Sequence, residues 1–198
     1  MDDEQLAGLA SQGDRDALAT LIQQYEVWIY TVAHKIALRE QDAREITQNV
    51  VSKLVTAIRA YQSPGNFRAW LAAVTARAAF DFLRQAGRRE PPGEAVPFEE
   101  VKEVCSDPAP NPREALEGQN LRECVEKAMA DLTPQQRAIL TLRLDEDLPT
   151  KDIAARLEIP PKLVRVQLSR AYARLRTLLA DVAQHYFPVR KSHERDTL

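Results

Sequence analysis

The chain has 198 residues, of which 44% are hydrophobic, and this is enough for one or two globular domains with ordinary cores. Its formal net charge of −2 argues against a generally basic nucleic-acid-binding protein. No apolar run approaches the ~20 residues that a membrane-spanning helix needs, and the start MDDEQLAGLA is acidic rather than a basic signal sequence, so we expect a cytoplasmic protein with no membrane insertion.

Two long amphipathic helices are predicted in the first part of the chain. Apolar residues recur at helical spacing from Asp16 to Ile36, with no Pro or Gly between them, and again from Asp42 to about Arg59. The second helix has one apolar side that would enter a core and an opposite side that we expect to be exposed. The exposed side carries Asp42, Glu45, Gln48, Asn49 and Lys53.

A third helix is predicted after the turn-rich loop from Tyr61 to Asn66, and it runs from Phe67 to about Gly87. Its apolar stripe is predicted to bury Phe67, Leu71, Val74, Ala78 and Phe82. A second stripe carries Arg77, Arg84 and Arg88, and Asp81 lies within it. An ion pair of Asp81 with one of the neighbouring arginines is the plain structural interpretation, with a contribution of roughly 0.2–0.5 kcal/mol.

An acidic linker is predicted over residues 90–118, which hold six prolines and eight acidic residues and show little periodicity. A new helix is predicted from Leu121 to Met129. Another begins at a capping box in which Thr133 is the cap and Gln136 reaches back to it. We therefore expect an all-α protein with a first domain over 1–89, the linker, a second domain over 119–184 and a tail over 185–198.

The stretch from Pro149 to Arg176 has the pattern of a helix-turn-helix. Thr150 is predicted as the N-cap of a short first helix, and the break at Glu158-Ile159-Pro160 precedes Pro161, which suits the first turn of a second helix. The buried stripe of this second helix is predicted to hold Val164, Leu168, Ala171, Leu175 and Leu178. A solvated helical hairpin is the alternative, but the spacing favours a helix that enters a DNA major groove.

The outward face of the second helix has no acidic residue and combines basic with small side chains. It carries Lys162, Arg165, Val166, Ser169, Arg170, Ala173 and Arg176. Arg165 and Arg170 are predicted to reach guanine edges or phosphates and Val166 a thymine methyl. Lys162 and Arg176, nearer the ends, are predicted to contact phosphates, and less is expected of the flanking Gln167 and Arg174.

The sequence contains no recognisable catalytic or metal-binding constellation. Its three histidines, His34, His185 and His193, stand far apart with no Cys or His at metal-ligand spacing, and no Gly-rich phosphate loop is present. We therefore expect no enzymatic activity, no metal and no cofactor. Cys105 and Cys124 are too few for a disulfide framework, so we expect free thiols.

Taken together, these motifs resemble a bacterial RNA polymerase sigma factor of the sigma-70 family, in its extracytoplasmic-function (ECF) group. The first domain resembles the family through Gly13-Asp14-Arg15-Asp16-Ala17, Asp42-Ala43-Arg44-Glu45-Ile46-Thr47-Gln48, Phe67-Arg68-Ala69-Trp70-Leu71, Asp81-Phe82-Leu83-Arg84 and Gly87-Arg88-Arg89. The second domain does so through Leu132-Thr133-Pro134-Gln135-Gln136-Arg137 and the helix-turn-helix. The resemblance covers nearly all of the chain except the linker and the tail.

The resemblance implies a function and partners. The first domain would bind the β′ clamp helices of RNA polymerase core through Asp42, Glu45, Gln48 and Asn49. It would recognise and melt the minus-ten element through Tyr61, Asn66, Arg77, Arg84 and Arg88, with Tyr61 free to stack on a base. The second domain would read the minus-thirty-five element through Lys162, Arg165, Val166, Ser169, Arg170 and Arg176, close to the β flap. An anti-sigma factor is a further expected partner.

Two other functions stay open at this point. One is a stand-alone helix-turn-helix regulator that binds promoter DNA without polymerase, which would leave the first domain unexplained. The other is a sigma-like protein that binds only an anti-sigma partner. The chain departs from the family pattern at Asn49, Arg77 and Glu158, where Glu, Asn and Gly are common, and these departures keep the second alternative open.

Overall fold

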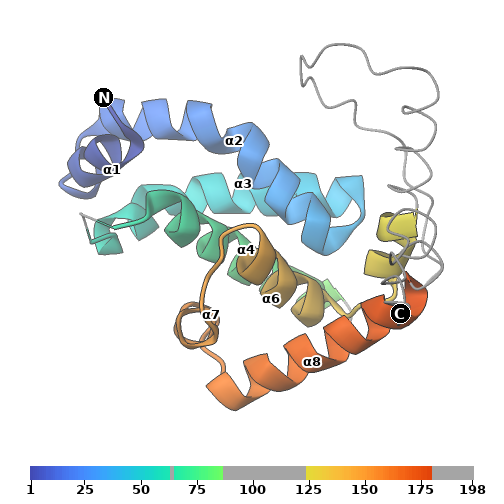
Figure 1. Ribbon diagram of the computed structural model, residues 1–198. Helices are drawn as coiled ribbons and strands as arrows, with labels where there is room; N and C mark the ends of the chain where they lie inside the picture. The colour runs from blue at the N-terminus through green and yellow to red at the C-terminus, as the bar shows by residue number, and fades with distance from the viewer. Residues whose placement is uncertain (63–64, 87–123, 180–198) are drawn as a thin grey trace, which may run out of the picture. The chain divides into compact units, whose positions relative to one another are not determined.

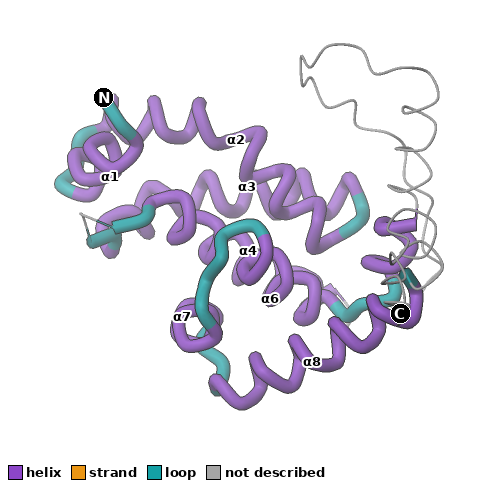
Figure 2. Tube along the Cα trace, viewed as in Figure 1, coloured by secondary structure: helices purple, strands orange, loops and turns teal. Residues whose placement is uncertain are grey.

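The computed structural model describes residues 1–62, 65–86 and 124–179. In this part of the chain every regular element is a helix, as Figure 2 shows, and the predicted all-α class is confirmed. The predicted linker, the predicted tail, Arg88 and Cys105 lie outside the described residues. The predicted domain boundaries also fall outside them, so these boundaries stay a prediction.

Figure 1 labels the helices along the chain. Their bounds are α1 Asp3–Ser11, α2 Arg15–Ala37, α3 Glu40–Ala57, the 3-10 helix η1 Ile58–Ala60, α4 Phe67–Ala86, a helical stretch over 124–130, α6 Pro134–Leu144, α7 Thr150–Leu157 and α8 Pro161–Leu178. The helices predicted around Leu21, Ile46, Leu71 and Leu140 and the helix-turn-helix are all present.

The described residues form two compact units. The larger holds residues 1–62, 65–86 and 133–169, and the smaller holds 124–132 and 170–179, so the division falls within α8. In the smaller unit Ala128, Leu132 and Ala171 are buried, and Arg174 donates to Asp131 at 3.5 Å.

Helix α1 is an element that the sequence reasoning did not predict. Asp2 accepts a hydrogen bond from the backbone of Gln5, whose side chain accepts one from the backbone of Asp2, so a capping box starts the helix. Leu6, Ala7 and Ala10 of this helix are buried. The capping box was therefore the local signal from which this helix could have been found.

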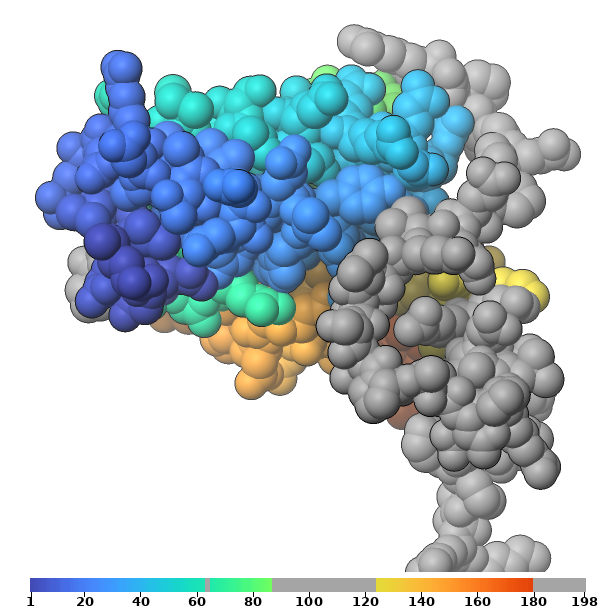
Figure 3. Space-filling model, turned by 90° about the horizontal axis from the view of Figure 1, so that it is seen from above, coloured from blue at the N-terminus to red at the C-terminus, as the bar shows by residue number. Residues whose placement is uncertain are grey.

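The core of the larger unit lies between α2, α3 and α4, and Figure 3 shows α2 (blue) and α3 (cyan) side by side. Phe67 and Leu71 of α4 are buried as predicted, but Val74, Ala78 and Phe82 are only half-buried. The buried face of α4 is instead made mostly of small residues, namely Ala69, Ala72, Ala73, Thr75, Ala76 and Ala79. Small side chains let neighbouring helices approach α4 closely, and a rule based on large apolar residues misses such a face.

Of the two helix N-caps predicted in the second domain, one is confirmed and the other is wrong. Thr133 caps α6 and Gln136 reaches back to it, which confirms the capping box. Thr150, in contrast, is the first residue of α7 rather than its cap. The cap is Pro149, which makes no side-chain hydrogen bond, because a proline has no side-chain acceptor to offer.

Candidate nucleic-acid interface

The outer side of α3 presents the four residues predicted to bind polymerase. Glu45, Gln48 and Asn49 are exposed and Asp42 is half-buried, with an Oδ2 atom 4.0 Å from Arg39 Nε. The opposite side fixes this orientation because its residues enter the core. Those residues are Ala43, Ile46, Thr47, Val50 and Leu54. The helix therefore offers a polar, partly acidic face to solvent.

The arginines of α4 are held by carboxylates. Arg77 Nε lies 3.9 Å from Asp81 and Arg84 Nη2 lies 3.3 Å from it, so the predicted intrahelical ion pair is confirmed. Arg84 also lies over the ring of Phe80, 5.8 Å from its centroid. Arg77 in addition donates to Glu158 at 2.7 Å. A phosphate that approaches this face therefore competes with protein carboxylates already in place.

Glu158 is the C-cap that follows the last residue of α7, and it adopts the left-handed conformation with φ 53°. Glycine is the residue that tolerates this conformation without cost, so a glutamate here is a local departure from backbone preference. The hydrogen bond from Arg77 lowers the pKa of the Glu158 carboxyl and raises the pKa of Arg77. Two of the three positions at which the chain departs from the family pattern are thus paired with each other.

Further polar contacts within the larger unit join α2 and α4 to the segment that contains α6. Lys35 Nζ lies 2.9 Å from Asp145, and Arg68 Nε lies 3.3 Å from Glu146. Arg137 of α6 is only 6% exposed, and its Nε donates to the backbone carbonyl of Ile36 at 2.6 Å. The basic groups of the first predicted domain are therefore partly matched by acidic groups of the second.

Tyr61, in the loop that precedes α4, is buried, although it was predicted to be free to stack on a base. Tyr61 is 6% exposed, and its ring packs edge-on against Phe67 and Trp70, with centroids 5.6 and 5.4 Å away. In this conformation the ring is not available to stack on a base, because it belongs to the core. Asn66 is exposed, but its Oδ1 accepts from Ala69 N at 2.9 Å and so caps α4.

Glu4 of α1 contacts this loop, and the sequence reasoning missed it. Its carboxylate accepts hydrogen bonds from the hydroxyl of Tyr61, from Gly65 N at 3.2 Å and from Phe67 N at 2.5 Å. Burial works against the charged form, but the three hydrogen bonds outweigh it and lower the pKa of Glu4 below its usual value. No local sequence signal marks this residue, since its partners lie 57 to 63 positions away.

Helix α8 presents all six residues predicted to read DNA on its solvent side. Lys162, Arg165, Val166, Ser169, Arg170 and Arg176 are exposed. Val164, Leu168 and Ala171 are buried as predicted, whereas Leu178 is 38% exposed. The two flanking residues are engaged, because Gln167 accepts from Gln136 at 3.1 Å and Arg174 pairs with Asp131. The two residues of which less was expected thus contact other parts of the protein, whereas the six residues predicted to contact DNA are exposed.

Among the described residues, no cluster of His, Cys, Asp and Glu could hold a metal ion. None of their helices combines the length and apolar composition that crossing a membrane requires. Cys124 is a free thiol, as expected.

Two family models match the chain in series. Residues 21–89 match "Sigma-70 region 2" and residues 122–175 match "Sigma-70, region 4". These two segments contain every residue proposed above to contact DNA except Arg176, and every residue proposed to contact polymerase. Helix α1 and Glu4 precede the first match.

Curated relatives include three sigma factors. The chain is 29% identical over 171 residues to ECF RNA polymerase sigma factor SigE of Mycolicibacterium smegmatis, and the match covers 85% of this chain and 65% of that protein. It is 27% identical to the RNA polymerase sigma-H factor of Pseudomonas aeruginosa, with 85% and 89% covered. It is 25% identical to the ECF RNA polymerase sigma-E factor of Escherichia coli, with 85% and 90% covered.

Two solved structures share the fold. One is CnrH in complex with the cytosolic domain of CnrY, with a TM-score of 0.57, 21% identity and coverage of 90% of this chain and 97% of that one. The other is the sigma factor RpoE in complex with the anti-sigma factor NepR from Bartonella quintana, with a TM-score of 0.60, 18% identity and coverage of 82% and 96%.

Proposed function

This chain belongs to the sigma-70 family, in the ECF group, and from that premise we propose that it directs RNA polymerase core to specific promoters and helps to open them. The observation that carries the proposal is the pair of region 2 and region 4 segments in one chain, each with an exposed face suited to its task. Region 4 presents the basic side of α8, and region 2 presents the polar side of α3.

In this proposal the second domain reads duplex DNA. A helix fits the major groove, where Arg165 and Arg170 can donate to guanine edges and the methyl groups of Val166 can contact a thymine methyl. Lys162 and Arg176, near the two ends of α8, would contact phosphates and fix the register. The element read would be the minus-thirty-five element, with the β flap of polymerase nearby.

The first domain would bind polymerase and hold the melted strand. Asp42, Glu45, Gln48 and Asn49 would contact the β′ clamp helices. Arg77, Arg84 and Arg88 would contact the unpaired minus-ten strand, with Asn66 at the start of α4. Tyr61 is proposed as a support of this region rather than a stacking platform, because its ring is buried. The site of action would be the cytoplasm, and an anti-sigma factor would be a regulatory partner.

Reconstituted transcription tests the proposal. The purified chain is mixed with core polymerase and a library of upstream regions from its own genome, and run-off transcripts are sequenced. Transcripts that start at a shared pair of promoter elements, and only when the chain is present, are the expected result. Binding to promoter DNA without binding to core in a pull-down would instead favour a stand-alone regulator. Binding to neither core nor promoter DNA would favour a protein that only engages an anti-sigma partner.

A further inference from the structure

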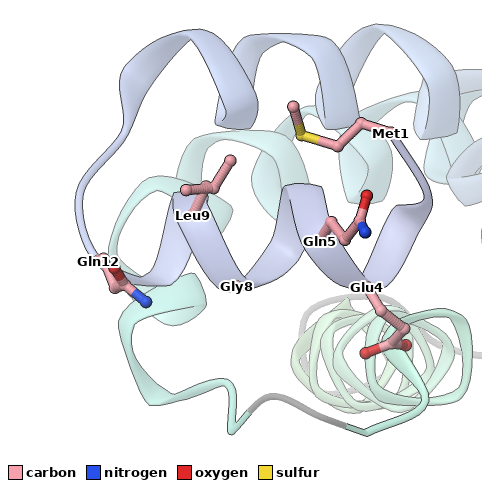
Figure 4. A pocket seen from close by; sticks show the side chains of 6 residues that line it. All are labelled: Met1, Glu4, Gln5, Gly8, Leu9 and Gln12. Atoms are coloured by element: carbon pink, nitrogen blue, oxygen red, sulfur yellow. The ribbon is translucent and has the colours of Figure 1, made fainter.

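One carboxylate ties both ends of the loop between η1 and α4 to the N-terminal helix. Glu4 accepts from the hydroxyl of Tyr61 at the start of the loop, and from the backbone of Gly65 and Phe67 at its end. Figure 4 shows the Glu4 side chain leaving α1 toward the segment that leads into α4. These three donors lie within residues 61–67, and the described residues of that stretch make no other side-chain hydrogen bond to α1.

The contact with Phe67 acts at a helix terminus. Phe67 is the first residue of α4, so its N–H has no partner within the helix, and the positive end of the helix dipole favours an anion there. Glu4 supplies that anion from another helix, while Asn66 Oδ1 satisfies Ala69 N at 2.9 Å. Hydrogen bonds to an ionised acceptor are the strong ones, and the lowered pKa of Glu4 keeps it ionised at neutral pH.

The described part of the loop is also closely packed around Gly65. A Cβ atom added to Gly65 would lie 2.9 Å from the backbone oxygen of Gln62 and 3.0 Å from the hydroxyl oxygen of Tyr61, so the approach of these groups requires glycine. The Tyr61 ring is held between Phe67 and Trp70. The close approach at Gly65, the packing of the Tyr61 ring and the hydrogen bonds to Glu4 therefore all hold the described loop residues in the same arrangement.

We propose that Glu4 is a positioning residue for promoter opening, which fixes the start of α4 and the adjacent Asn66 in the orientation that receives the unpaired minus-ten strand. The inference rests on the proposed function. It goes beyond the region 2 match, which begins at residue 21 and so leaves Glu4 out. A pre-ordered start of α4 means that the cost of ordering it is met on folding rather than when the strand binds.

The test separates opening from binding with the full chain and core polymerase. A promoter carrying 2-aminopurine in the minus-ten element reports the opening rate, and filter binding at low temperature reports the affinity of the closed complex. For Glu4→Gln we expect opening to slow on the order of tenfold, since bonds to a charged acceptor are replaced by weaker ones. Closed-complex affinity is expected to change less than about twofold, since duplex contacts made by α8 are untouched.

Asp3→Asn is the matched control. Asp3 is the neighbouring acid of α1 and also accepts from a tyrosine hydroxyl, that of Tyr25 in α2 at 2.5 Å, but it does not bond the loop. This variant should open promoters at the wild-type rate. Tyr61→Phe keeps the ring and removes only the hydroxyl, so it should slow opening by a smaller factor. The double variant of Glu4 and Tyr61 should show less than the product of the two single effects.

The outcomes separate this inference from the proposed function. If the wild-type chain opens no promoter, the proposed function fails and the inference with it. If the wild-type chain opens its promoter and Glu4→Gln opens it equally fast, the inference is overturned while the proposed function stands. If Glu4→Gln lowers closed-complex affinity, opening rate and thermal midpoint in the same proportion, Glu4 is only a structural tie, and the positioning role is overturned as well.

Discussion

Replacement of the buried Arg137 tests how α6 is held against α2. Arg137 is 6% exposed and donates to the carbonyl of Ile36, in the last turn of α2, where the negative end of the helix dipole favours a cation. Burial lowers the pKa of Arg137 to about 10, so the side chain still carries its charge at neutral pH. A hydrogen bond that involves a charged group contributes about 1.5–3 kcal/mol.

We therefore expect Arg137→Ala to lower the free energy of unfolding by about 2–3 kcal/mol, from the lost bond and the lost packing of the arginine stem. Arg137→Met keeps an apolar stem and removes a buried charge, so its loss should be smaller. Both are measured by urea unfolding followed by helical circular dichroism. Arg143→Ala on the same helix is the control. Arg143 also donates to a backbone carbonyl, that of Leu148 at 3.1 Å, but its side chain is half-exposed and solvent screens the bond, so about 1 kcal/mol or less is expected.

An Arg137→Ala variant within about 0.5 kcal/mol of the wild type would refute the reasoning, because surface substitutions have effects of that size. A loss equal to that of Arg143→Ala would have the same meaning. In either case the bond to Ile36 would not contribute to the stability of the folded chain.

Three further predictions concern the two interfaces and pH. Asp42→Lys combined with Glu45→Lys should weaken binding to core polymerase in a pull-down with little change in thermal midpoint, and unchanged binding would argue against the outer face of α3. Arg165→Ala should cost about 1–3 kcal/mol of DNA-binding free energy and relax the sequence preference at one base pair. Lys162→Ala should weaken binding to all DNA sequences alike and lower the slope of log affinity against log salt concentration by about one. A sequence preference that Arg165→Ala leaves intact would contradict base reading. The folded-state pKa of Glu4 is lowered, so the stability that this carboxylate contributes is present above the unfolded pKa of about 4.3 and is lost as pH falls through the folded pKa. Glu4→Gln should therefore make the free energy of unfolding depend less steeply on pH below about pH 4. Parallel curves for the variant and the wild type would contradict this.

Much of the secondary structure was readable from the sequence because its causes are local. Helical periodicity places the long helices, and the capping box at Thr133 and the pairing of Asp81 with Arg77 and Arg84 involve residues three or four positions apart. The exposed face of α8 follows from the same periodicity, because burial of Val164, Leu168 and Ala171 leaves only one side outward. The recognisable sigma-70 motifs lie on these elements.

The tertiary structure decided the contacts between residues that are distant in sequence. Glu4 and Phe67 are 63 positions apart and Arg137 and Ile36 are 101 apart, and no pattern in either local segment indicates the partner. The same holds for Tyr61, whose aromatic ring suits a DNA platform and a core equally well until Phe67, Trp70 and Glu4 surround it. The sequence by itself determined which faces of the helices are polar, whereas packing between the helices determined which polar groups are already occupied by the protein's own side chains.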